Sequence, residues 1–91
     1  MRNYINFLIG HSLYIKGKYN DALTYYNQVN EQHLCAEDNE EFTFTKAFAH
    51  LTQKEYKQAS RYFYSQIGFN KKYNQEAEYY YAYCEFSQQN Y

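Results

Sequence analysis

The sequence lacks most of the features that mark secreted, membrane-spanning or nucleic-acid-binding proteins. Its only two cysteines, Cys35 and Cys84, are too few and too far apart for a disulfide framework, so we expect reduced thiols. Nine basic and ten acidic residues give a formal net charge of −1, without the concentrated basic face of a nucleic-acid module. No segment approaches the roughly 20 apolar residues that a membrane span needs. Residues 1–17 contain no small-residue cleavage site of the kind that ends a signal peptide.

These absences favour a cytoplasmic protein with no nucleic-acid partner and no membrane insertion. A periplasmic location stays open if a parent protein carries a signal outside this sequence. Repeat arrays also occur behind secretion signals, so the compartment does not follow from the residues given.

Recognisable catalytic and cofactor-binding motifs are absent as well. There is no Gly-rich phosphate loop, no G-x-S-x-G and no H-E-x-x-H. His33, Cys35 and His50 come nearest to a set of metal ligands, but their spacing matches no recognised pattern. The acidic residues at positions 37–41 are better explained by the start of a helix than by a catalytic pair. We therefore expect no enzymatic activity, no catalytic residue, no metal and no cofactor.

Aromatic residues are abundant: 14 Tyr and 7 Phe make up 23% of the chain, which has neither Trp nor Pro. Large rings bury much area each, so a compact core needs few of them. Tyr is also amphipathic, and many of these rings can lie half out of the core with the hydroxyl in water.

The apolar residues follow a helical period, and no segment sustains the alternation of a strand. Two further helical segments begin at Tyr19 and Tyr56. Asp38, with Glu41 three residues later, predicts a capping box, and Asn74 is a plausible N-cap for the last helix. The pattern therefore predicts an all-α chain of five helices. The three main apolar stripes lie at about residues 4–16, 40–53 and 75–88.

Part of the sequence is repeated. The segment GKYNDAL at 17–23 recurs, less sharply, as KEYKQAS at 54–60, so that Tyr19 and Tyr56 are 56 − 19 = 37 residues apart. A period of 35 to 37 residues with one helix pair per unit is typical of an α-solenoid. Small residues at equivalent positions are expected to let the paired helices approach closely. Tyr19 and Tyr56 are expected to fill the gap toward the next unit. The predicted small packing residues are Gly10, Ala22, Ala47, Ala59 and Ala82.

This pattern resembles the tetratricopeptide repeat family. The first unit carries Gly10, the G-K-Y turn at 17–19, Ala22 and a following aromatic residue at Tyr26. The resemblance implies a right-handed stack of antiparallel helix pairs in a single domain, residues 1–91. Its units would be about 3–38 and 39–73, with an incomplete third unit at 74–91. The second unit keeps Ala47, Tyr56, Ala59 and Phe63, and the third keeps Ala82 and Tyr91.

Three features depart from the family. The units are slightly longer than 34 residues, the closing proline is absent, and the large residues of the first helices lie one position later. The last helix also lacks the second helix of its pair, so that the face of Ala82 would have no partner. We expect either a fragment of a longer array or ends that are covered by a second copy, and the sequence leaves both open.

The one-residue offset affects the predicted binding surface. If the helices keep the family orientation, a row of aromatic residues faces the concave groove, where the partners of solenoids usually lie. The alternative is that the first helices are rotated and the rings belong to the core. His11 is similarly either a polar group of the groove or a partly buried histidine with a hydrogen-bond partner. The candidate groove residues are Phe7, His11, Tyr14, Phe44, Phe48, Tyr79 and Tyr83.

The resulting functional hypothesis is a protein–protein interaction scaffold that binds a peptide or a partner helix in an aromatic-rich groove. Two alternatives stay open. One is a regulatory module that senses a peptide, and the other is a structural segment that associates with itself, for instance as a homodimer through uncapped helix ends.

Overall fold

The computed structural model describes residues 2–89, and these residues form five α-helices, one short 3-10 helix and no strand. This confirms the predicted all-α chain of five helices. None of the described helices is long and apolar enough to cross a membrane. Tyr91, which the sequence assigned to the third unit, lies outside the described residues. The elements are α1 (Arg2–Ile15), α2 (Tyr19–Tyr26), the 3-10 helix η1 (Glu31–His33), α3 (Ala36–Thr52), α4 (Tyr56–Ser65) and α5 (Asn74–Gln89).

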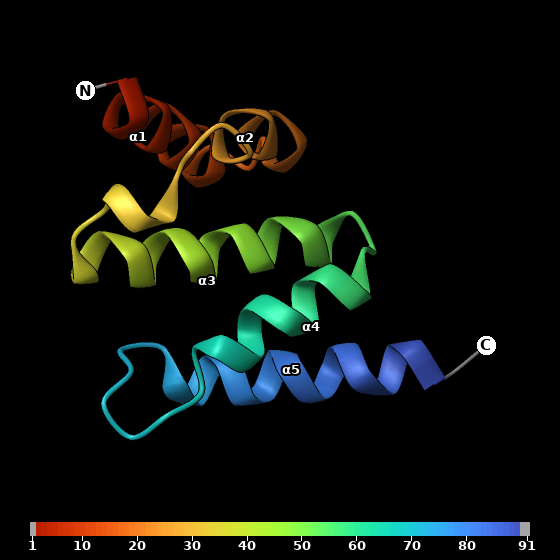
Figure 1. Cartoon of the computed structure of the whole chain (residues 1–91). Helices are drawn as coiled ribbons and strands as arrows, with labels where there is room; N and C mark the ends of the chain where they lie inside the picture. The colour runs from red at the N-terminus through yellow and green to blue at the C-terminus, as the bar shows by residue number, and fades with distance from the viewer. Residues whose placement is uncertain (1, 90–91) are drawn as a thin grey trace.

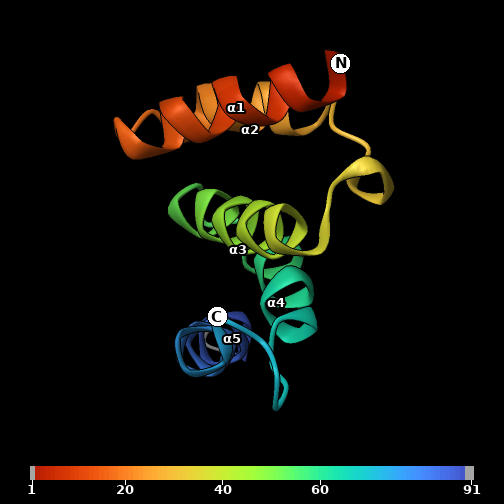
Figure 2. The same ribbon diagram turned by 90° about the vertical axis from the view of Figure 1, so that its left-hand side faces the viewer.

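The helices pack in the order in which they occur along the chain. Each helix contacts the next one, and α1 also contacts α3. Figure 1 shows α1 and α2 at one end, α3 and α4 in the middle and α5 at the other end, and Figure 2 shows the same order after a quarter turn. The molecule measures 41 × 29 × 19 Å. Most contacts between helices are therefore made by helices that follow each other in the sequence.

The turn that ends α1 and the turn that ends α3 have the same backbone geometry. Gly17 (φ +79°) and Lys54 (φ +61°) are both left-handed, and they are 54 − 17 = 37 residues apart. In each turn the N–H of the next residue donates to a carbonyl five positions back, that of Leu13 in one and that of His50 in the other. This is the Schellman arrangement, which satisfies carbonyls that a helix end leaves free. The repeat in the sequence thus has a matching repeat in hydrogen bonding.

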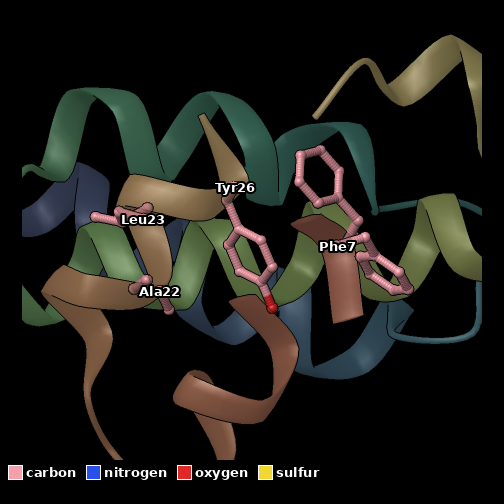
Figure 3. Close-up of a cluster of buried hydrophobic side chains, with 6 residues drawn as sticks. Phe7, Ala22, Leu23 and Tyr26 are labelled. Atoms are coloured by element: carbon pink, nitrogen blue, oxygen red, sulfur yellow. The ribbon is translucent and has the colours of Figure 1, made fainter. Parts of the chain in front are cut away.

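Two clusters of buried side chains form the core. The first joins α1, α2 and α3, and four of its members are labelled in Figure 3. The second joins α3, α4 and α5. Because α3 contributes to both clusters, it is the central helix and is buried on two sides. The first cluster consists of Phe7, Ala22, Leu23, Tyr26, Phe42 and Ala49. The second consists of Ala47, Ala59, Phe63, Ala77 and Cys84.

Gly10 allows α1 to approach α2 closely. A Cβ atom at this position would lie 2.5 Å from the ring of Tyr26 and 3.3 Å from the carbonyl oxygen of Ala22. In real structures, Cβ atoms essentially never lie within 3.0 Å of a heavy atom to which they are not bonded. The ring of Tyr26 therefore occupies the space that any larger residue at position 10 would need.

The equivalent small residues of the later units are Ala47 and Cys84, both fully buried. They continue a period of 37 residues, since 47 − 10 = 37 and 84 − 47 = 37. Ala82, which the sequence predicted for this role, is exposed. The prediction assumed a shorter last period, and α5 instead buries the face that carries Ala77 and Cys84 against α4 and α3. Ala82 lies on a face that no other described helix covers.

The predicted N-caps are also corrected. Helix α3 begins at Ala36, so Asp38 lies in its first turn, and the N-cap is Cys35, whose side chain makes no capping hydrogen bond. Asp38 still stabilises the helix, because a negative charge in the first turn complements the helix dipole. Asn74 is the first residue of α5, and its Oδ1 accepts a hydrogen bond from the N–H of Gly68 at 2.8 Å. Its side chain therefore holds the preceding loop.

Candidate functional site: an aromatic pocket between α3, α4 and α5

An open pocket of about 200 Å³ lies between α3, the first residue of α4 and α5. Three of the predicted groove residues meet there: Phe48, Tyr79 and Tyr83. We call it the aromatic pocket, and it is lined by Phe48, Leu51, Tyr56, Tyr79, Tyr80 and Tyr83.

Helical spacing and the turn after α3 bring these side chains together. Phe48 and Leu51 are three residues apart on α3, and Tyr79 and Tyr83 are four apart on α5, so each pair shares one face of its helix. Tyr56 begins α4 directly after the left-handed turn at Lys54. The pocket thus depends on the Schellman turn as well as on the two long helices.

The rings of the pocket pack mainly edge to face. The centroids of Phe48 and Tyr80 are 5.5 Å apart at an interplanar angle of 84°, and those of Tyr56 and Tyr83 are 6.3 Å apart at 59°. Such tilted contacts are the arrangements that aromatic quadrupoles favour. Tyr79 is 67% exposed and Tyr83 48% exposed. The inner rings are therefore held by packing, while the rings of the rim are accessible to a ligand.

The aromatic surface continues from the pocket toward α1 and α2. The ring of Phe48 lies 6.0 Å from that of Tyr14 and 5.8 Å from that of Tyr19. Tyr14 and Tyr19 themselves contact edge to face at 5.5 Å. We call Tyr14, Tyr19, Phe48 and Tyr80 the aromatic row. It connects four helices, and Tyr14 is the predicted groove residue at its α1 end.

The other predicted groove residues lie elsewhere. Phe7 is only 4% exposed and belongs to the first core cluster, so its assignment to an accessible groove is wrong. Its ring packs edge to face on that of Phe42 of α3, with centroids 6.2 Å apart, so the side chain faces the core between α1 and α3. Phe44 is partly buried and stacks on Tyr73 at 4.3 Å, outside the aromatic pocket. The ring of His11 lies between Phe7 and Tyr14, and its buried Nδ1 has no hydrogen-bond partner among the described residues.

Three residues of the pocket were not among the predicted groove residues. Tyr56 had been assigned only to repeat packing, and Leu51 and Tyr80 had no binding role. The spacing of Tyr79, Tyr80 and Tyr83 places all three within one half of the helix circumference, which is the signal that the sequence offered for Tyr80. Nothing in the spacing of Leu51 distinguished a pocket wall from a core position.

Burial also shifts the ionisation of several groups. It raises the pKa of Tyr14 and of Tyr26 to about 12, in both cases chiefly through desolvation. Burial likewise raises the pKa of the Cys84 thiol to about 11. The neighbouring Tyr19, Tyr26 and Glu41 add to the effect at Tyr14. At neutral pH these two phenols and the thiol therefore stay protonated, and Tyr14 contributes a neutral hydroxyl group to the aromatic row.

Alkaline pH is expected to destabilise the protein. A pKa that is higher in the folded state means that the folded state binds the proton more tightly. The stabilisation from Tyr14 and Tyr26 is complete below pH 10, the ordinary pKa of tyrosine. It is lost as the pH rises toward 12, the pKa of these groups in the folded state. Fully buried Tyr26 contributes about 2–3 kcal/mol to this loss, and partly buried Tyr14 contributes less. Urea unfolding followed by circular dichroism between pH 8 and pH 12 measures it.

The variant Tyr26→Phe tests whether Tyr26 causes the loss of stability at alkaline pH. It removes the buried hydrogen bond to Oγ1 of Thr45 (3.0 Å), at a cost of about 1 kcal/mol that does not depend on pH. The fall in stability above pH 10 is expected to be shallower than in the wild type. An equally steep fall in Tyr26→Phe contradicts the prediction.

Two larger depressions lie where the start of α3 meets the end of α4, with volumes of about 540 and 370 Å³. Asn39, Gln66 and Lys71 line both, and Glu40 and Arg61 each line one. Most of the residues that line them are polar, and no candidate groove residue lies there. Within residues 2–89, no group of three or more His, Cys, Asp or Glu side chains is placed to hold a metal ion. The aromatic pocket is therefore the site that unites the most sequence-predicted residues.

Comparison of the chain with protein-family models, with curated proteins and with solved structures gives no match. Function is therefore inferred from the geometry of the aromatic pocket.

Proposed function

We propose that the chain is a tetratricopeptide-like α-solenoid segment that serves as a protein–protein interaction scaffold. It holds an extended peptide or a partner helix along the aromatic row, with one side chain of the partner inserted into the aromatic pocket. The pocket itself carries this proposal, because it gathers rings from three helices and leaves two of them, Tyr79 and Tyr83, exposed. Clustered aromatic anchors are the residues that contribute most binding energy at protein interfaces.

Two observations support the solenoid arrangement. The left-handed turns at Gly17 and Lys54 repeat at 37 residues with the same hydrogen bonds. Helices pack mainly on their neighbours along the chain, as they do when each repeat contacts only the next. The surface that crosses successive units is the one on which such arrays bind partners, and the aromatic row follows it.

The chemistry of the rings suits a partner that is partly apolar. Tyr rings present a large rigid surface at low cost in side-chain entropy, and their hydroxyl groups can donate hydrogen bonds to peptide carbonyls. The packed inner rings of Phe48 and Tyr80 need no rearrangement on binding. Such preorganisation increases affinity, because less side-chain entropy is lost when the partner binds.

Removal of both rim tyrosines is expected to lower the affinity for peptides at least tenfold. Peptides are first selected on the whole chain from a displayed random library, and their affinities are then measured by fluorescence anisotropy. The test variant is the double substitution Tyr79→Ala and Tyr83→Ala. Each hot-spot ring contributes about 2 kcal/mol. Both rings are exposed, at 67% and 48%, so the thermal midpoint is expected to change little.

The matched control is the double substitution Tyr64→Ala and Phe69→Ala. These rings are 64% and 99% exposed and lie outside the aromatic pocket. The control is expected to bind the selected peptides like the wild type. Equal losses in both double variants, or full binding by the pocket variant, would show that the partner does not occupy this groove.

Self-association is a second candidate, favoured by an exposed apolar stripe on α1. The stripe is formed by Ile5, Leu8, Ile9 and Ile15, and the first three follow helical spacing. Light scattering across a wide concentration range separates the two functions. A mass that grows with concentration in the wild type, but stays at the monomer value in Leu8→Lys, supports self-association. A monomer mass at every concentration supports binding of a different protein in the aromatic pocket.

A further inference from the structure

We infer that the aromatic pocket binds the basic side chain, lysine or arginine, of the partner peptide. The inference rests on the proposed function and specifies the chemistry of the residue that the groove recognises. The size of the pocket, the aromatic composition of its walls and an acidic residue on the same face of α5 support it.

The size of the pocket fits a single side chain. Its volume is about 200 Å³, whereas pockets for drug-sized molecules usually measure about 300–1,000 Å³. The pocket is open toward the two exposed rings of Tyr79 and Tyr83, so a chain lying across α3 and α5 can extend one residue into it.

The walls of the pocket favour a cation. Five of the six lining side chains are aromatic, and the faces of aromatic rings carry negative quadrupole potential. A cation within about 6 Å of a ring centroid is attracted to that face, and several rings around one site form an aromatic cage. Leu51 completes the wall and provides apolar surface for the methylene stem of a long basic residue.

Helix α5 carries one acidic residue on the face that lines the pocket. Glu76 is exposed and precedes Tyr79 by three residues and Tyr83 by seven, so it shares their face of the helix. Glu78 and Glu85 lie on other faces, and Glu85 lines a separate depression. Helix α5 has no lysine or arginine, and no basic side chain from residues 2–89 lines the pocket.

The chain already holds its own cations in this way. The Nζ atom of Lys46 lies 5.3 Å from the ring centroid of Phe42 and 5.1 Å from that of Tyr62. The Nζ atom of Lys72 lies 5.3 Å from the ring centroid of Tyr73. Both lysines lie outside the aromatic pocket, whose larger set of rings has no such occupant from residues 2–89.

The test compares two peptides that differ only in charge. Acetyl-Gly-Gly-Arg-Gly-Gly-amide and the same peptide with citrulline in place of arginine have side chains of nearly equal shape, one charged and one neutral. Each is titrated into the whole chain, and the ring signals of Tyr79 and Tyr83 are followed by NMR. The arginine peptide is expected to bind about 3-fold to 30-fold more tightly than the citrulline peptide, as cation–π contacts predict.

Two single substitutions define the site. Tyr83→Leu keeps an apolar side chain but removes a ring, and it is expected to reduce the advantage of arginine to less than about 2-fold. Tyr64→Leu, which removes an exposed ring outside the pocket, is expected to preserve the advantage.

The outcomes separate this inference from the proposed function. Equal affinities for the two peptides, with shifts at Tyr79 and Tyr83, overturn the inference and leave the pocket as a neutral peptide anchor. An absence of shifts at these rings with either peptide also overturns it. The library selection then decides independently whether the groove captures longer peptides.

Discussion

Replacement of Phe63 by Ala is expected to lower the free energy of unfolding by about 3–5 kcal/mol. Phe63 is fully buried, and its ring centroid lies 5.4 Å from that of Tyr80 and 5.6 Å from that of Phe44. The other fully buried members of the second cluster are alanines and Cys84. Such small side chains cannot extend into the cavity that the lost ring would leave, so little of it is refilled.

This loss is large relative to the total free energy of unfolding. A domain of this length has a stability of roughly 5–14 kcal/mol at about 0.05–0.15 kcal/mol per residue, so the substitution removes about a fifth of it or more. Urea unfolding followed by circular dichroism measures the change. The neighbouring substitution Tyr64→Ala, at an exposed position, is the control and is expected to cost less than about 0.5 kcal/mol. Similar costs at the two positions would mean that the second cluster is not packed around Phe63.

The second large effect is expected at Gly10. Helix propensity alone predicts that Gly10→Ala stabilises α1 by about 1 kcal/mol. The new Cβ atom would lie 2.5 Å from the ring of Tyr26, however, and that ring is held by a hydrogen bond to Thr45 and by full burial. We expect overpacking to prevail and the substitution to destabilise the protein by about 1–3 kcal/mol. The sign of the effect therefore distinguishes the tertiary contact from the local preference.

A double-mutant cycle checks the cause. In the background of Tyr26→Ala, the ring that obstructs position 10 is gone, and Gly10→Ala is expected to cost much less than in the wild type. Ser12→Ala, at an exposed position of α1, reports the helix preference without the contact and is expected to be neutral or slightly stabilising. A stabilising Gly10→Ala in the wild type would show that α1 and α2 cross less closely.

The extent of each helix was largely predictable because it depends on local interactions. Apolar spacing located the five helices, and the structure starts the second and fourth at Tyr19 and Tyr56, as the sequence indicated. Gly17 marked the first turn, since its left-handed conformation strains residues that have a Cβ atom. The start of α3 was missed by several residues, because no capping side chain marks Cys35.

The pocket was only partly predictable because it depends on how the helices are rotated about their axes. Phe7 and Phe48 lie on similar apolar stripes, yet Phe7 is buried in the first cluster and Phe48 lines the pocket. Ala82 and Cys84 differ by two positions, and only the packing of α5 on α4 places Cys84 inside and Ala82 outside.

The sequence by itself determined that the chain is all-helical, that its turns recur at 37 residues and that aromatic residues make up 23% of the chain. These properties follow from side-chain period, turn chemistry and composition, all of which act over a few neighbouring residues. Only the tertiary structure decided which rings are core and which form the aromatic pocket. A rotation of one residue, about 100° in a helix with 3.6 residues per turn, moves a side chain from one neighbour to another. The energy that selects among such rotations comes from the packing of several helices together.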